Sequence, residues 1–157
     1  MGRVTSVNIS DRKGVRKREV QSITLQVGHG IVGDAHAGDW HRQISLLAEE
    51  SIDTMRALGL SNLTPGAFAE NINTEGIALN TLPVGTVLRV GACRLRVTQI
   101  GKECHNDGCA IQKATGRCVM PTEGIFAVVL TGGTVQKGDA IELEAATEVV
   151  TERVAIR

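Results

Sequence analysis

The feature that most constrains the fold of this chain is the frequency of glycine. The chain has 18 glycines among its 157 residues, and they divide it into short segments. Glycine is unfavourable inside helices and strands, and it adopts the positive φ angles that tight turns require. A chain interrupted this often is therefore expected to consist mainly of short strands joined by turns.

Several of the short segments have the residue pattern of strands. Apolar and polar residues alternate in Val4–Ile9, Val20–Val27 and Asp139–Glu144, as in a strand with one buried face. The segments 86–90 and 93–100 flank Gly91-Ala92, a dipeptide that predicts a hairpin turn between two strands.

Two segments are predicted to be helical. In Ile44–Leu60 the apolar residues recur with a period close to 3.6, and Gly59 suits the C-terminal end of a helix. The apolar segment Ile125–Leu130 predicts a second, short helix that Gly132-Gly133 would end. Many short strands with one clear helix predict a mostly β fold, a compact β-barrel with short helical decoration.

Length and composition limit the class of protein. A chain of 157 residues suits a single domain with one core, expected at about residues 4–144, with 145–157 as a tail or final element. The 17 basic and 17 acidic residues give no net charge, so no overall field attracts nucleic acid or membrane. Two phenylalanines, one tryptophan and no tyrosine provide few rings for stacking bases. The chain begins without an apolar signal region, so we expect a cytoplasmic protein.

The densest group of reactive side chains comprises Cys104, His105, Cys109 and Cys118, all within fifteen residues. These side chains could bind structural zinc, although the paired C-x2-C spacing of zinc ribbons is missing. A disulfide is disfavoured inside cells. The third interpretation is a reactive cysteine, since nearby cations stabilise a thiolate. The fourth cysteine, Cys93, lies on a predicted strand and is expected to be a core residue.

A glycine-rich segment, residues 28–43, contains three of the four histidines. His36 and His41 could bind a metal together with Asp34 or Asp39. The alternative is that this loop forms the wall of a ligand pocket, because glycine-rich loops allow close approach of the backbone to a ligand.

Two further segments carry polar groups of interest. Arg12–Arg18 contains five cations and is either a solvated hairpin tip or an anion site, in which Lys13, Lys17 and Arg42 would bind a phosphate or carboxylate. Glu70-Asn71 lies in a small and apolar stretch. If this pair is buried it needs specific partners, and it would then tie loops together through hydrogen bonds.

Four motifs, in this order, resemble those of the MOSC domain, named after the C-terminal domain of molybdenum cofactor sulfurases. They are Gly33–Gly38, His41–Gln43, Pro65–Ile72 and Cys104–Cys118, and the resemblance extends from about Val4 to Glu144. It implies a compact, mostly β barrel of the MOSC or pyruvate-kinase-like type, in a small stand-alone protein. The larger members have Gly-x-Phe-Gly-Glu-Asn where this chain has Ala69 before Glu70.

The resemblance also implies a role in sulfur or molybdenum-cofactor chemistry. Some members are thought to accept sulfur as a cysteine persulfide from pyridoxal-phosphate cysteine desulfurases. Others hold the molybdenum cofactor, use a cysteine thiolate as a metal ligand and reduce N-hydroxylated compounds. The family cysteine precedes a short apolar strand, which matches Cys109 before Ala110-Ile111. No part of the chain resembles a pyridoxal-phosphate domain.

From the resemblance we expect Cys109 to carry a persulfide or bind molybdenum, and Cys104 to be the second thiol. Lys102, His105 and Arg117 would favour the thiolate. The residues expected to bind the cofactor, molybdopterin, are Lys13, Lys17, His36, Arg42, Glu70 and Asn71. The expected partners are a cysteine desulfurase or proteins of molybdenum-cofactor biosynthesis. Two alternatives remain, a molybdenum-dependent reductase of N-hydroxylated compounds and a zinc-stabilised, non-catalytic binding module.

Overall fold

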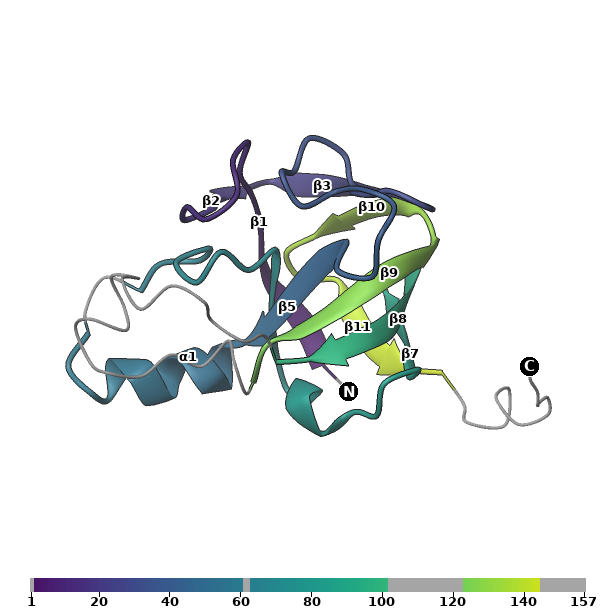
Figure 1. Cartoon of the computed structure of the whole chain (residues 1–157). Coiled ribbons are helices and arrows are strands. Elements are labelled where there is room, and N and C mark those ends of the chain that lie inside the picture. The colour runs from purple at the N-terminus through teal and green to yellow at the C-terminus, as the bar shows by residue number, and fades with distance from the viewer. Residues whose placement is uncertain (1, 61–62, 102–122, 145–157) are drawn as a thin grey trace.

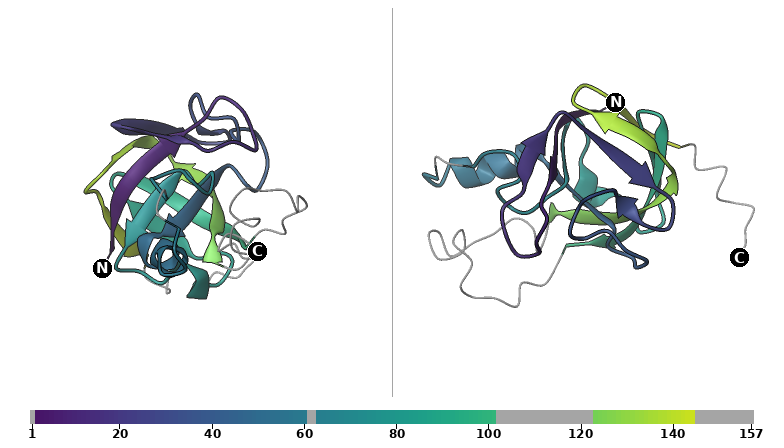
Figure 2. Two further views of the ribbon diagram at one scale, coloured as in Figure 1. Left: turned by 90° about the vertical axis from the view of Figure 1, so that its left-hand side faces the viewer. Right: turned by 90° about the horizontal axis from the view of Figure 1, so that it is seen from above.

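The computed structural model describes residues 2–60, 63–101 and 123–144 of the chain. Seven strands form a closed barrel, in the order β11 (Ala140–Leu143), β7 (Val87–Val90), β8 (Cys93–Ile100), β9 (Ile125–Thr131), β5 (Ile44–Ala48), β6 (Ile72–Glu75) and β1 (Gly2–Ile9). The barrel closes because β1 pairs with both β6 and β11. Strands β5 and β6 are parallel, and the other pairs are antiparallel. The predicted mostly β barrel is confirmed (Figures 1 and 2).

The remaining strands lie beside the barrel. Strand β2 (Arg18–Val20) extends the barrel sheet next to β1. Strands β10 (Gly133–Gln136), β3 (Ser22–Gln26) and β4 (Gly30–Ile31) form a second sheet, at the top of Figure 1. The buried side chains of this sheet pack into the same core as those of the barrel. A 3-10 turn, η1 (Leu79–Thr81), precedes β7.

A second, smaller core lies outside the barrel wall. The helix α1 (Glu49–Arg56) follows β5 directly and contributes Ile52 and Met55 to it. The wall contributes Leu47 and Phe126, and the loop before β6 contributes Phe68. Full burial of such a side chain stabilises the fold by about 1.5–3 kcal/mol. This core therefore holds α1 and the loop before β6 against β5 and β9.

Both helix predictions need correction. The helix predicted over Ile44–Leu60 exists only as α1, because its first five residues form β5. All five are buried, since β5 faces the barrel core on one side and the second core on the other. The helix predicted over Ile125–Leu130 is wrong, because these residues form β9, which also faces both cores. A short apolar run covered on both faces lacks the alternation that distinguishes a strand.

The other local predictions are confirmed. The alternating segments become β1, β3 and β11. Strands β7 and β8 form the predicted hairpin, and Gly91 takes a φ of 58° in its turn. Cys93 is buried at the start of β8, as expected for a core residue. No helix in the described part of the chain is long and apolar enough to cross a membrane.

Candidate functional site

A buried charged cluster lies where the basic β1–β2 loop meets the glycine-rich loop after β4. The side chains of Lys17 and Asp34 are fully buried, and Lys17 Nζ lies 2.9 Å from Asp34 Oδ1. Lys17 Nζ also lies 3.0 Å from Ser10 Oγ and 3.0 Å from His36 Nδ1. An ammonium group has three N–H donors. Lys17 therefore has a partner within the chain for each of them, and it is not placed to hold a ligand.

Asp34 is charged in this cluster. Burial by itself raises the pKa of Asp34, but the hydrogen bond and the charge of Lys17 outweigh burial and hold the pKa below its usual value. The backbone N–H groups of Ser10 and His36 also donate to the carboxylate, at 3.1 and 3.0 Å. The result is an ion pair that joins β1, the basic loop and the glycine-rich loop.

The loop before β6 supports this cluster from the other side. Lys17 N–H donates to Gly66 O at 2.9 Å, and the backbones approach so closely that a Cβ on Gly66 would lie 2.2 Å from Lys17 O. Gly66 also has a φ of +88°. Glycine is therefore required at this position on two independent grounds.

Glu70 and Asn71 hold that loop in place. The Glu70 carboxylate accepts N–H groups from Gly66 and Phe68 and the side-chain amide of Asn73, at 3.0, 2.9 and 2.8 Å. Burial raises the pKa of Glu70, and these donors act in the opposite direction. Asn71 accepts the Ser45 N–H at 3.0 Å. Both residues are fully buried, so any effect they have on a ligand passes through the loops that they hold.

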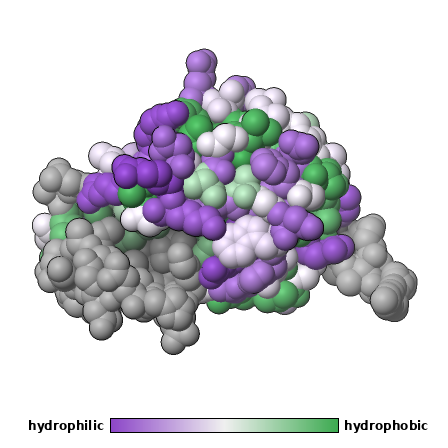
Figure 3. Space-filling view, turned by 45° about the horizontal axis from the view of Figure 1, so that its top comes forward, coloured by the Kyte–Doolittle hydropathy of each residue, from purple (hydrophilic) through white to green (hydrophobic). Residues whose placement is uncertain are grey.

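A basic and aromatic surface, the Trp40 patch, comprises Lys13, Trp40 and Arg42. The Lys13 ammonium lies 5.3 Å from the centroid of the Trp40 ring, and the Arg42 guanidinium lies 4.7 Å from it. Arg42 also lies 5.6 Å from the Phe126 ring. Within the described part of the chain, no carboxylate forms an ion pair with either cation. The patch therefore combines a ring with two cations. Hydrophilic and hydrophobic residues are mixed on the face of the molecule in Figure 3.

The glycine-rich loop is fixed to the strands from which the cysteine segment, residues 102–122, departs. His41 Nε2 lies 2.9 Å from Gln99 Oε1, and Gln99 Nε2 donates to Gly101 O at 2.8 Å. Gly101 N–H then donates to Gly124 O at 2.6 Å. Gly101 and Gly124, which are described and flank the cysteine segment, are thus held together, and Gln99 connects Gly101 to the glycine-rich loop.

The predicted reactive residues themselves, Lys102, Cys104, His105, Cys109 and Arg117, lie outside the described residues, as does Cys118. Their roles stay predictions. Among the described residues, no group of three or more histidine, cysteine or acidic side chains could hold a metal ion. His36 and His41 also have different partners, Lys17 and Gln99, so the described part of the loop does not form the histidine pair of a metal site.

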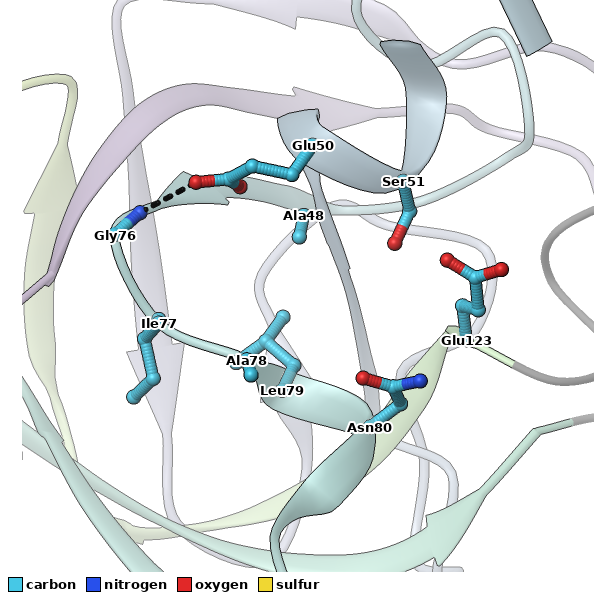
Figure 4. A pocket seen from close by; sticks show the side chains of 9 residues that line it. All are labelled: Ala48, Glu50, Ser51, Gly76, Ile77, Ala78, Leu79, Asn80 and Glu123. Atoms are coloured by element: carbon cyan, nitrogen blue, oxygen red, sulfur yellow. Dashed lines mark hydrogen bonds between the residues drawn. The ribbon is translucent and has the colours of Figure 1, made fainter. Parts of the chain in front are cut away.

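A separate cavity of about 320 Å³ lies where β5 leads into α1 (Figure 4). Its apolar side chains are Ala48, Ile77, Ala78 and Leu79, and its polar ones are Glu50, Ser51, Asn80 and Glu123. Glu123 is the first described residue after the cysteine segment. The cavity therefore lies beside the point at which the described chain resumes.

Sequence reasoning missed three residues that shape the site. Trp40 organises the two cations, and Gln99 connects the loop to the cysteine segment. Buried Gln43 donates to Gly38 O at 3.0 Å and accepts the Val129 N–H at 3.0 Å, which fixes the loop to β9. A lone tryptophan between two basic segments was a usable signal. Gln43 stood in the motif His41–Gln43, whereas nothing in the sequence distinguishes Gln99.

Comparisons with known proteins agree with this architecture. The family model described as the MOSC domain matches residues 33–142. The structure resembles that of the YuaD protein from Bacillus subtilis, with a TM-score of 0.75, 21% identity, and coverage of 91% of this chain and 96% of that one. It also resembles YiiM from Geobacillus stearothermophilus, with a TM-score of 0.68, 17% identity, and coverage of 92% and 76%. YiiM from Escherichia coli gives a TM-score of 0.61, 20% identity, and coverage of 91% and 70%. No curated protein matches the chain.

Proposed function

The chain belongs to the MOSC family, and on that premise we propose that it serves in sulfur and molybdenum-cofactor metabolism, with Cys109 carrying sulfur as a persulfide. Cys104 is the second thiol of the pair. Lys102, His105 and Arg117 stabilise the thiolate, because cations near a cysteine lower its pKa and so increase the nucleophilic fraction.

One observation carries this proposal. The hydrogen bonds from His41 through Gln99 to Gly101 attach the glycine-rich loop to the point where the cysteine segment begins. The loop that carries Trp40 and Arg42 is therefore joined to the strand that precedes the cysteine segment. This connection supports a role for the loop in binding an anionic acceptor of the sulfur.

The described side chains fit one end of the molybdenum cofactor. That cofactor joins a pterin to a phosphate, and the Trp40 patch offers an aromatic ring with two cations. Lys13 and Arg42 would hold the phosphate, and the ion pair of Lys17 with Asp34 would hold the glycine-rich loop that carries Arg42. The metal end would belong to a thiol in the segment 102–122. When bound, the cofactor would supply a centre for oxygen or sulfur transfer.

The proposed sulfur step exchanges one sulfur–sulfur bond for another. The Cys109 thiolate attacks the outer sulfur of a persulfide on a pyridoxal-phosphate cysteine desulfurase. The donor's S–S bond breaks, its cysteine leaves as a thiolate, and a persulfide forms on Cys109. No external oxidant or reductant is needed, because the attacking and leaving groups are both thiolates.

The test is to incubate the chain with a cysteine desulfurase and cysteine and to measure added sulfur by mass spectrometry. We expect wild type to gain one sulfur on the peptide that contains Cys109, and Cys109→Ser to gain none. Cys118→Ser, a thiol of the same segment, is the matched control and should gain sulfur as wild type does. Equal gain by wild type and Cys109→Ser, or no gain by either, contradicts the proposal.

Elemental analysis separates this function from the two alternatives. After expression with a supply of molybdenum cofactor, no molybdenum above background would count heavily against the reductase. Stoichiometric zinc that is lost on Cys→Ser substitution, together with unfolding, would favour the binding module.

A further inference from the structure

The cavity at the start of α1 contains polar side chains that the fold itself does not use. Its volume of about 320 Å³ lies at the lower end of the range typical of small-molecule sites. Ser51, Asn80 and Glu123 come from three different segments, and their side chains point toward the cavity in Figure 4. Within the described part of the chain, none of these three side chains has a hydrogen-bond or ion-pair partner. All three are therefore available to a ligand.

The charge of the cavity is negative. Glu123 lies on one side of it and Glu50 on another, where the Glu50 carboxylate accepts the Gly76 N–H at 2.8 Å. None of the described residues that line the cavity is basic. The N-terminal end of α1 carries about half a positive charge, which the two carboxylates outweigh. The cavity is therefore expected to attract cations and to repel anions.

The apolar part of the wall distinguishes an organic cation from a metal ion. Ala48, Ile77, Ala78 and Leu79 line the cavity together with the polar side chains. A metal ion needs several converging ligand atoms, and the described residues contain no group of three or more histidine, cysteine or acidic side chains that could hold one. Apolar side chains instead favour contact with hydrocarbon. The lining therefore matches a ligand that has a cationic end and an apolar body.

We infer that this cavity binds small primary ammonium ions that carry an apolar body. An ammonium group has three donors and no acceptor. Glu123 provides the charged acceptor, and Ser51 Oγ and Asn80 Oδ1 provide neutral ones. The apolar side chains cover the carbon chain of the ligand, and Glu50 adds negative charge while it holds the Gly76 backbone. The inference goes beyond the proposed function and does not depend on any cysteine.

A proton–nitrogen NMR titration of the isotope-labelled chain with alkylammonium chlorides tests the inference. We expect butylammonium to shift the amide signals of Ser51 and Gly76, and to bind more tightly than methylammonium, because each buried methylene strengthens binding about fourfold. The neutral analogue n-butanol and the anion butyrate should shift these signals much less. No shift with butylammonium, equal shifts with n-butanol or butyrate, or equal affinity for methylammonium overturns the inference. Calcium chloride that shifts the same signals at a lower concentration than butylammonium would indicate a metal site, and would also overturn it.

Substitution of Glu123 separates binding in the cavity from a general attraction of cations to the surface. Glu123→Gln keeps the shape of the side chain and should weaken butylammonium binding at least about tenfold, because a hydrogen bond to a charged group is lost. Glu142→Gln is the matched control, since Glu142 is an exposed carboxylate on β11 that does not line the cavity, and it should bind as wild type does. The NMR spectrum of each variant also reports whether it is folded. Wild-type affinity in Glu123→Gln, or an equal loss in Glu142→Gln, overturns the inference. Either result leaves sulfur transfer to Cys109 untouched, and failure of that transfer leaves ammonium binding untouched.

Discussion

Replacement of Lys17 by methionine should destabilise the chain strongly, because it removes one partner of a fully buried ion pair. Methionine is similar in length and fills the space, so packing changes little. What remains is the Asp34 carboxylate, which keeps the N–H groups of Ser10 and His36 but has no cation.

The size of the effect follows from the burial of both side chains. Removal of one partner from a buried pair destabilises by about 3–5 kcal/mol, because the other charge stays buried without compensation. No discount for solvent applies, since both side chains are fully buried. The loss is a large part of the total stability of about 5–15 kcal/mol that is typical of a domain.

The loss should depend on pH in a defined direction. In wild type the pKa of Asp34 is lowered, so its contribution to stability is present above the unfolded pKa of about 3.9 and disappears as pH falls through the folded value. In Lys17→Met the buried carboxylate becomes easier to protonate. The difference between the two proteins should therefore be largest near neutral pH and shrink toward about pH 4.

Urea unfolding followed by Trp40 fluorescence and circular dichroism measures this difference. The double variant Lys17→Met/Asp34→Asn keeps the test meaningful if the single variant does not fold, because no charge then remains buried. It should be more stable than Lys17→Met alone. A loss below about 1 kcal/mol in Lys17→Met at neutral pH, the range of an exposed pair, would refute this reasoning.

Three further outcomes test the supports of the site. Gly66→Ala should lose clearly more stability in thermal unfolding than Gly33→Ala. Both glycines have positive φ, which costs about 1–2 kcal/mol for alanine, but only a Cβ on Gly66 would meet Lys17 O. Equal losses in the two variants would contradict the close approach of the Gly66 and Lys17 backbones. Glu70→Gln should lower the free energy of unfolding in urea by about 1–3 kcal/mol, because the amide NH₂ of glutamine would face a backbone N–H donor. Wild-type stability of this variant would contradict the assignment of both Glu70 oxygens as acceptors. Cys93 should resist iodoacetamide in the native chain and react after unfolding, because it is buried and burial raises the pKa of its thiol; rapid native labelling in peptide mass spectra would argue against its core position.

The sequence predicted those parts of the fold that depend on local pattern. Strands with one buried face, such as β1 and β3, alternate and were recognised, as was the hairpin at Gly91. Strands β5 and β9 were missed because the second core covers the face that would otherwise be polar. The residues that cover this face belong to α1 and the loop before β6. The local sequence of a strand does not indicate that another segment will pack on it.

The site was predictable in composition but not in geometry. The cationic run and the glycine-rich loop were both identified, and Lys13 and Arg42 do meet, around Trp40. Lys17 lies in the same run yet turns inward, because Asp34 provides a charge that pairs with it in the interior. A negative charge beside a lysine in the interior makes the lysine a structural residue and not a ligand-binding one. For Lys17 that charge belongs to Asp34, which is 17 positions away in the sequence.

The buried polar contacts explain why residues far apart in the chain act on one site. Glu70 accepts the Gly66 N–H, and the Gly66 backbone lies against that of Lys17. The Lys17 side chain in turn contacts both Asp34 and His36. The links from Glu70 to Lys17 and Asp34 are buried, and the link to His36 is partly buried, so a change at Glu70 is expected to shift the Lys17 backbone or leave an N–H unsatisfied. We therefore expect substitutions at Glu70 and Gly66 to alter the NMR signals of the His36 ring, although neither residue touches His36. If the NMR signals of the His36 ring stay unchanged while stability falls, the contacts of Glu70 and Gly66 contribute to stability but do not affect the His36 ring.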